Sequence, residues 1–322
     1  MKNLIYSTKL LANKYCINEK KLERFLHQNK VPVIDGHIDG KYLPGIIDFV
    51  EQHNDRIDSF NKKEKPFYIS NEKKISIYQN DAINFLEKLP DLSVDLIITD
   101  PAYSGMNNKL KLGKGRIVGK YAEKGTENGK WFDEFVDTNE NYIRFLSQCR
   151  RVLKKSTGHI YIMFDSYSLL SLGPVVRKYF DVKNLITWDK INMGMGHYYR
   201  RRHEYIIFAT NGNNRKIRNH NFPDVWRFKR IHNAAYPTQK PVELFQAMIF
   251  ASAEKGFVVC DPFTGSSSSS IAAIKNDCSF IGCDISAKAV EISKKRIDHY
   301  LKFDEDILQK KSSAIENEVF WK

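Results

Sequence analysis

From about residue 67 onwards, short apolar runs alternate with segments whose apolar residues recur at helical spacing. Residues 94–99 (VDLIIT) and 158–164 (GHIYIMF) are almost continuously apolar, which is typical of strands buried on both faces of a sheet. Further strands are predicted at residues 75–78, 184–188, 204–210, 257–260 and 279–282. Helices are predicted at residues 81–89, 141–155, 240–254, 267–276 and 287–301. This alternation predicts an α/β fold with a doubly wound, mostly parallel sheet.

The amino-terminal part of the chain has a different pattern. Two short runs of helical spacing follow one another, with apolar positions at Leu10, Leu11, Tyr15, Leu22, Phe25 and Leu26. They predict a small helical unit over residues 1–60 that resembles a helix–turn–helix, with a further helix near residues 44–54. Residues 58–66 are polar and end in proline, which predicts a linker to a second domain over residues 61–322. The charged residues 302–322 predict a loosely attached tail.

The composition describes a globular chain without membrane-spanning segments. Apolar residues make up 42% of the 322 residues, yet no apolar run reaches the roughly 18 residues that a membrane span needs. The first residues do not form a secretory signal, so we expect a cytoplasmic protein. The five cysteines are an odd number without a CxxC pair, which argues against disulfides and structural zinc. His197, His203 and His232 lack metal-ligand spacing, so we expect no metal.

The net charge of +13 is concentrated in two segments. Residues 104–130 hold seven Lys/Arg and two Asp/Glu, and residues 190–231 hold ten and two. Both segments lie in long insertions, at residues 104–140 and 190–235, that interrupt the alternation of strands and helices. Such a distribution favours a polyanion as the partner, although a well-solvated basic surface is the alternative.

The predicted strand 94–99 ends in the sequence Asp100-Pro101-Ala102-Tyr103. The carboxyl ends of parallel strands are where such sheets bind their ligands. The Asp100 carboxylate and the Pro101 carbonyl offer two hydrogen-bond acceptors there, and Tyr103 offers a surface for stacking. A plain turn with Asp and Pro as strand breakers is the alternative.

A second segment, FVVCDPFTGSSSSSIAAI at residues 257–274, predicts a strand, a loop of small residues and a helix. The backbone of such a loop can approach a ligand closely. It is not a phosphate-binding P-loop, because no lysine follows the small residues. The next predicted strand ends at Asp284, where an acid commonly accepts hydrogen bonds from ribose hydroxyls. A serine-rich linker and a helix cap at Asp284 remain open alternatives.

Four motifs in this order, TDPAY, PTQKP at residues 237–241, CDPFTGS and FIGCD, resemble the β class of amino-methylating DNA methyltransferases. The resemblance covers about residues 70–300 and implies a circularly permuted, Rossmann-like methyltransferase fold. It further implies that S-adenosylmethionine donates a methyl group to the exocyclic amine of adenine in duplex DNA, after base flipping.

The resemblance assigns roles to individual residues. Asp100 and the Pro101 carbonyl would hold the target amine, Ala102 lies in the same motif, and Tyr103 would stack on the base. Cofactor contacts are implied for Asp81, Ala82, Lys240, Asp261, Pro262, Phe263, Gly265, Ser266, Ser267 and Asp284. The basic segments supply candidate contacts to double-stranded DNA, namely Lys109, Lys111, Lys114, Arg116, Arg200, Arg201 and Arg202. The chain departs from the family pattern at Ala102 (usually proline), Ser267 (usually glycine) and Tyr236 (usually histidine).

Two alternatives stay open. The target amine can belong to cytosine, although an aspartate at position 100 favours adenine in this family. The chain can also be a DNA-binding regulator with a degenerate methyltransferase domain, against which Asp100 and Tyr103 argue. A homodimer and a cognate restriction endonuclease are further partners that the sequence leaves open.

Overall fold

The computed structural model describes residues 5–9, 22–23, 26, 33–34, 37–39, 66–70, 74–101, 138–194, 198–212, 214–218, 221–231, 234, 236 and 239–309. The chain divides into two compact units, Met1–Lys65 and Pro66–Lys322. Among the helices in these ranges, none has the length and apolar character needed to cross a membrane.

The described part of the first unit combines helical residues with a small sheet. Strands β1 (Ile5–Ser7), β2 (Val33–Ile34) and β3 (His37–Asp39) are antiparallel, in the order β1-β3-β2. Leu22 and Leu26 are helical and buried. The sequence predicted only helices here, because strands of two or three residues are too short to show an alternating pattern. The helix predicted near residues 44–54 lies outside the described residues.

The second unit is built on a nine-stranded sheet in the order β10-β8-β9-β7-β6-β11-β12-β5-β4. The strands are β4 (Tyr68–Ser70), β5 (Ile75–Gln79), β6 (Leu96–Thr99), β7 (His159–Phe164), β8 (Asp181–Asp189), β9 (His203–Thr210), β10 (Val225–Arg227), β11 (Val258–Asp261) and β12 (Ser279–Asp284). Strand β9 is antiparallel to both neighbours and β4 is antiparallel to β5, while the other pairings are parallel. The predicted mostly parallel sheet is therefore confirmed.

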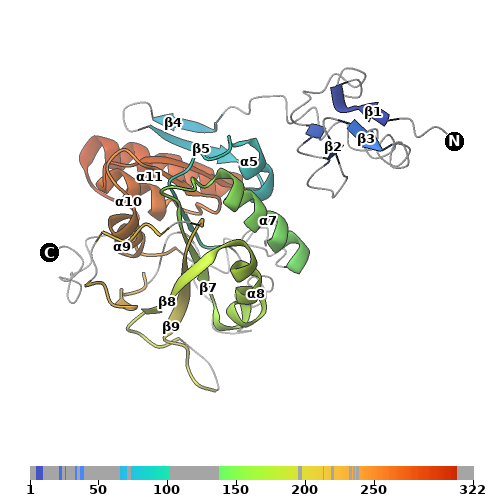
Figure 1. Ribbon diagram of the computed structural model, residues 1–322. Coiled ribbons are helices and arrows are strands. Elements are labelled where there is room, and N and C mark those ends of the chain that lie inside the picture. The colour runs from blue at the N-terminus through green and yellow to red at the C-terminus, as the bar shows by residue number, and fades with distance from the viewer. Residues whose placement is uncertain are drawn as a thin grey trace. The chain divides into compact units, whose positions relative to one another are not determined.

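Helices cover both faces of this sheet (Figure 1). They are α5 (Ala82–Lys88), α7 (Asn139–Val152), α8 (Ser166–Tyr179), α9 (Val242–Ser252), α10 (Ser268–Lys275) and α11 (Ala287–Phe303). One apolar cluster joins α9, α10 and α11 to the sheet, and a second cluster joins α5, α7 and α8. The sheet is therefore doubly wound, as the sequence predicted.

The next described helices after β6 and β11 pack in different apolar clusters, and this indicates the position of the site. Helix α7 follows β6 and packs in one cluster, whereas α10 follows β11 and packs in the other. Because β6 and β11 are neighbours, their carboxyl ends flank a topological switch point. Sheets of this class bind their ligands there.

The predictions from the sequence differ from the structure in a few details. Helix α8 and strands β4 and β10 were not predicted. Within residues 190–235, β9 corresponds to the strand predicted at residues 204–210, and β10 is an additional strand. Residues 304–309 are not a loose tail, because Asp306 forms a buried ion pair with Arg296 of α11. Residues 310–322 lie outside the described residues.

Candidate active site

Asp100 follows the last residue of β6, a strand in which every residue is buried. Its side chain keeps 20% of its surface exposed, and Pro101 beside it is buried. The Lys240 ammonium group donates a hydrogen bond to Oδ2 of Asp100, although the two residues are 140 positions apart. Ala102 and Tyr103, the other residues of the predicted catalytic motif, lie outside the described residues.

Two more charged side chains complete a compact cluster with Asp100 and Lys240. Glu204, in β9, accepts a hydrogen bond of 2.9 Å from Lys190, and its second oxygen lies 3.9 Å from the Lys240 Nζ. Since β9 is antiparallel to β7, its first residues lie at the edge where β6 and β7 end. Two carboxylates and two ammonium groups thus share one edge of the sheet, and their charges balance.

Burial and mutual attraction act in opposite directions on these groups. Burial raises the pKa of the Asp100 carboxyl above its ordinary value, although the Lys240 ammonium opposes the shift. Burial alone would also raise the pKa of Glu204, but Lys240 and Lys190 together lower it. The pKa of Lys240 is raised, because Asp100 and Glu204 outweigh the effect of its burial. Lys240 is therefore a positively charged group held between two carboxylates.

The small-residue loop at residues 262–267 follows β11 and is joined to the end of β12 by Asp284. The backbone N–H of Gly265 donates to Oδ2 of Asp284 at 2.8 Å, and that of Ser286 donates to Oδ1 at 2.9 Å. Burial raises the pKa of the Asp284 carboxyl, and these two hydrogen bonds only partly offset it. Asp284 is thus a partly exposed carboxylate at the carboxyl end of a central strand.

Two residues of this loop have a left-handed backbone. Gly265 has φ of 51°, and a Cβ atom there would lie 3.3 Å from the Tyr236 ring. Ser267, at the N-cap of α10, has φ of 60°, a conformation that glycine adopts far more easily. The Ser267 hydroxyl is buried and has no hydrogen-bond partner among the described residues.

Asp261, the last residue of β11, is buried and holds the loop at residues 262–267 by hydrogen bonds. Its carboxylate accepts hydrogen bonds from the Ser269 hydroxyl at 2.6 Å and from the Phe263 N–H at 3.0 Å. Only 2% of its surface is exposed, and burial raises its pKa to about 7. The ring of Phe263 packs edge-on against Phe145 of α7, and Pro262 is buried.

Asp81 is the N-cap residue of α5 and directly follows Asn80, which is bonded to the end of β12. Its carboxylate accepts hydrogen bonds from the N–H groups of Ile83 and Asn84, at 3.0 and 3.1 Å. The N–H of Asn80 donates to the Asp284 carbonyl at 3.1 Å, which brings the start of α5 beside the end of β12. Ala82 is buried in the first turn. The structure therefore brings Asp81, Asp100, Lys240, Asp261, Gly265 and Asp284 to the same edge of the sheet.

The three predicted DNA-contacting arginines lie near this edge, but two of them are paired with carboxylates. Arg202 binds both oxygens of Asp189 at 2.7 Å, and Arg201 lies 3.3 Å from Asp165 and over the Tyr167 ring. The Nε of Arg200 donates to the Gly194 carbonyl. Lys109, Lys111, Lys114 and Arg116 lie outside the described residues.

Lys190 and Glu204 lie in the segments WDK (residues 188–190) and HEYIIFATNG (203–212), which resemble family segments that wall the base pocket, but their ion pairs in this cluster were not predicted. Lys190 follows β8, and Glu204 lies near the start of β9. These strands come close to the end of β6 only in the folded sheet, so no local spacing in the sequence connects the two residues with Asp100. The signal that could have found them is a charged residue at the end of each strand facing the predicted site, Lys190 after β8 and Glu204 in β9.

Comparison with known proteins agrees with this geometry. Residues 94–295 match the family described as DNA methylase, so the chain belongs to that family and is a DNA methyltransferase. The DNA adenine methyltransferase YhdJ of Escherichia coli is 29% identical over 73% of this chain and 87% of its own length.

Two solved structures share the fold. PvuII DNA methyltransferase (cytosine-N4-specific) has a TM-score of 0.54 and 14% identity, covering 72% of this chain and 88% of that one. A putative DNA modification methylase from Thermus thermophilus, complexed with S-adenosyl-L-methionine, has a TM-score of 0.50 and 19% identity, covering 70% and 96%. At these identities the likeness concerns the fold alone.

Proposed function

We propose that this chain transfers a methyl group from S-adenosylmethionine to the N6 amine of adenine in double-stranded DNA. The observation that carries the proposal is the shared edge of β6, β11 and β12. Asp100 follows β6 and is a hydrogen-bond acceptor with 20% of its side chain exposed. The neighbouring strand, β11, leads into the loop at residues 262–267. Asp284, at the end of the next strand, β12, binds that loop at the Gly265 N–H. The target of the Escherichia coli relative is adenine by its name, which supports the choice of base.

The residues at this edge fit such a cofactor. Each oxygen of Asp284 accepts one backbone hydrogen bond and keeps a lone pair that a ribose hydroxyl can use. Burial raises the pKa of both Asp261 and Asp284, so both carboxylates would be stabilised by a cationic ligand. Gly265 lets the backbone approach a ligand without a side chain in between. When bound, S-adenosylmethionine supplies an electrophilic methyl group on a positively charged sulfur.

Asp100 and Pro101 would then act on the target amine. The carboxylate and the Pro101 carbonyl accept the two hydrogens of the amine, which aims its lone pair away from the base plane. The carboxylate also stabilises the positive charge that develops on the nitrogen, in a site where burial strengthens the attraction. Tyr103 would stack on the base, which has to leave the duplex to reach this edge.

Lys240 and the incoming amine both need the Asp100 carboxylate as a hydrogen-bond acceptor. Its ammonium group donates to Oδ2 of Asp100, the type of acceptor that the amine needs. Glu204, 3.9 Å from the same Nζ, offers Lys240 a second carboxylate. We infer that Lys240 moves toward Glu204 when the amine binds, so that the positive charge developing on the nitrogen does not face an ammonium group directly.

The partner at this edge is DNA, and its approach is proposed to run along the basic insertions. Arg200, Arg201 and Arg202 are the described candidates for contacts with phosphates or base edges. A homodimer, a cognate restriction endonuclease and a cytoplasmic location stay predictions of the sequence.

The test is to express the chain in a host that lacks adenine methylation and to map modified bases in the host DNA. We expect N6-methyladenine in a defined sequence context with the wild type and none with Asp100→Ala. N4-methylcytosine instead would transfer the proposal to the cytosine alternative.

A binding measurement separates the enzyme from a regulator. Asp100→Ala should bind S-adenosylmethionine within a few-fold of wild type, whereas Asp284→Ala should lose about 1.5–3 kcal/mol, the usual value for hydrogen bonds to a charged group. Cofactor binding by the wild type without any DNA modification would support a regulator with a degenerate domain.

A further inference from the structure

We propose that Arg296 is a positioning residue for the cofactor loop and acts through the segment that follows α11. We call residues 304–309 the C-terminal strap. The inference rests on the proposed function, since it concerns how the loop at residues 262–267 is held for S-adenosylmethionine. None of the four sequence motifs includes Arg296 or the strap.

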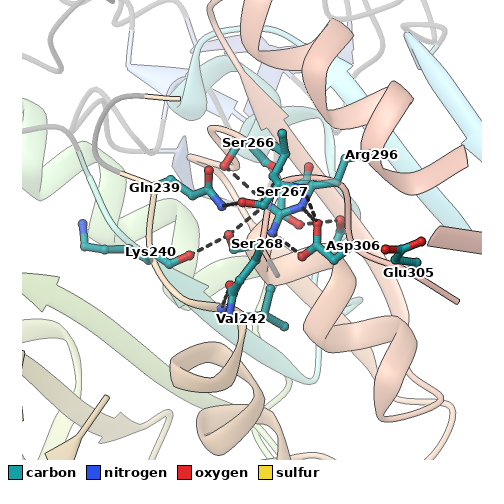
Figure 2. Close-up of polar contacts among 12 residues, drawn as sticks. Gln239, Lys240, Val242, Ser266, Ser267, Ser268, Arg296, Glu305 and Asp306 are labelled. Carbon is teal, nitrogen blue, oxygen red and sulfur yellow. Dashed lines mark hydrogen bonds and ion pairs between the residues drawn. The ribbon is translucent and has the colours of Figure 1, made fainter. Parts of the chain in front are cut away.

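Arg296 is completely buried in α11, and all three nitrogens of its guanidinium donate hydrogen bonds, to three partner residues (Figure 2). One terminal nitrogen donates to the Ser266 carbonyl at 2.7 Å and to the Ser268 hydroxyl at 3.0 Å. The other two nitrogens donate to the two oxygens of Asp306, at 2.8 and 2.7 Å. Arg296 therefore connects the cofactor loop with the strap.

One turn earlier on the same helix, Ser293 extends this connection. Its hydroxyl donates to the Gly265 carbonyl at 3.0 Å. The carbonyls of Gly265 and Ser266, which belong to consecutive peptide groups, are thus both bound by side chains of α11. The N–H of Gly265 is at the same time bound to Asp284. The backbone orientation of this left-handed glycine is fixed at both its N–H and its carbonyl.

The strap continues to the segment that carries Lys240. The Gln309 side-chain oxygen accepts a hydrogen bond of 2.8 Å from the N–H of Val242, the first residue of α9, and its amide nitrogen binds Glu243. The Leu308 carbonyl accepts one of 3.4 Å from the Gln239 side chain. Ser268, itself bound to Arg296, donates to the Lys240 carbonyl at 2.8 Å. The residue that pairs with Asp100 is therefore held by the same network as the cofactor loop.

A buried ion pair of this kind is poor evidence for a contribution to stability. Desolvation of the two charges costs about as much as their attraction gains, and apolar residues of similar volume often replace such pairs without loss. What an apolar pair cannot reproduce is the terminal nitrogen that donates to both the Ser266 carbonyl and the Ser268 hydroxyl. This difference separates positioning from mere structural support.

The first experiment uses the double variant Arg296→Met with Asp306→Leu, in the full chain. Because the pair is replaced as a unit, no unpaired charge is left, and we expect a folded protein whose melting temperature falls by only a few degrees through the lost hydrogen bonds to Ser266 and Ser268. Its affinity for S-adenosylmethionine should be reduced at least about tenfold in calorimetry. In methyl transfer, KM for the cofactor should rise by a similar factor, with KM for DNA unchanged. Arg144→Met, at a half-exposed arginine of α7 that lies 3.7 Å from Glu87, is the matched control and should leave the affinity unchanged.

The second experiment tests the strap by truncation. A chain that ends at Gln309 keeps the strap and should bind the cofactor as the full chain does. A chain that ends at Phe303 lacks Asp306 and should lose affinity by about the same factor as the double variant. Arg296→Lys, which keeps the charge facing Asp306 but loses the paired nitrogens of the guanidinium, should fall between wild type and the double variant.

The outcomes distinguish this inference from the proposed function. If the wild type binds no S-adenosylmethionine, the proposed function is wrong. If the wild type binds it and the folded double variant binds it equally well, Arg296 is only structural and the inference is overturned. A fall in apparent kcat with KM for the cofactor unchanged would overturn it as well, because it would indicate a general loss of folded enzyme.

Discussion

Ser267 is the residue at which the cofactor loop departs from its family's usual glycine, and the structure gives the departure a physical meaning. Its left-handed backbone, with φ of 60°, brings the Cβ of a serine close to the following carbonyl. Its buried hydroxyl has no hydrogen-bond partner among the described residues. Serine at this position is therefore tolerated at a cost in stability.

Ser267→Gly should accordingly stabilise the protein. Relief of the left-handed strain and removal of an unpaired hydroxyl each favour glycine by about 1 kcal/mol or more. The greater freedom of glycine in the unfolded chain opposes this by about 0.5–1 kcal/mol. We expect a net gain of about 1 kcal/mol in urea unfolding. Ser270→Gly, inside α10, is the control and should destabilise, since the Ser270 hydroxyl is bonded to the Ser267 carbonyl.

Asp261 makes the stability depend on pH. Burial raises its pKa to about 7 in the folded state, from the ordinary value of 3.8. The folded protein then binds the proton more tightly than the unfolded chain does. The stabilisation from protonated Asp261 is complete below about pH 4 and is lost as the pH rises to 7, with a slope of at most about 1.4 kcal/mol per pH unit.

Asp261→Asn should remove this part of the pH dependence. The difference in unfolding free energy between the variant and wild type should shift in favour of the variant as the pH rises from 4 to 7. It should then become constant above the folded pKa. Denaturant unfolding at several pH values measures it, and parallel curves for the two proteins would show that Asp261 is ionised throughout this range.

At the scale of elements, prediction from the sequence succeeded where the pattern was local. Strands β6 and β7 are buried on both faces, so their continuous apolar runs were unambiguous. Helix α8 was missed because Gly173 and Pro174 interrupt its pattern, although its buried residues pack against the sheet all the same. Strands β4 and β10 have three residues each, too few for a period.

In the candidate site, too, the residues that lie in local sequence motifs were predicted, and those that depend on distant contacts were not. Asp100, Gly265 and Asp284 lie in short motifs at strand ends, where residue type and local sequence suffice. Glu204 and Arg296 acquire their roles from partners that lie far away in the sequence. Asp100 and Glu204 meet only through Lys240, and Arg296 meets Ser266 across 30 positions. Contacts of this kind depend on the order of the strands, which spacing along the chain does not encode.

Strand β12 and the cofactor loop are packed so closely that Gly282 leaves no room for a side chain. A Cβ atom at this position would lie 2.4 Å from the Thr264 side chain and 2.7 Å from the Asp261 carbonyl. Gly282→Ala must therefore push the loop away from the strand. We expect a loss of about 1–3 kcal/mol in unfolding free energy and weaker binding of S-adenosylmethionine.

Ser279→Ala is the control for this prediction. Ser279 begins the same strand, and its truncation should change the stability by less than about 0.5 kcal/mol. Calorimetry and denaturant unfolding measure both variants. Gly282→Ala with unchanged cofactor binding would show that the position of the loop does not control the cofactor site.

At the scale of the whole molecule, the net charge of +13 predicts binding to DNA that depends on salt. The arginines at positions 200 to 202 differ in the carboxylates that face them, so we expect them to contribute unequally to this binding. The Asp189 carboxylate neutralises Arg202, which in turn lowers the pKa of Asp189, and Asp165 neutralises much of the charge of Arg201. The Nε of Arg200 donates to the Gly194 carbonyl, and among the described residues no carboxylate forms an ion pair with it.

Arg200→Ala should therefore change the salt dependence more than either neighbour does. Each phosphate that is neutralised contributes a slope of about −0.9 in log affinity against log salt, so its loss should flatten the slope by about one unit. Arg202→Ala should flatten it less and should destabilise the β8–β9 hairpin, because Asp189 loses a two-point partner and keeps Arg227 at 3.5 Å and the Ile191 N–H at 2.8 Å. A salt titration of DNA affinity for the single variants tests this, together with their melting temperatures. Equal slopes for Arg200→Ala and wild type would mean that Arg200 contacts no phosphate. If sequence preference is also unchanged, the basic charge that binds DNA lies elsewhere in the chain.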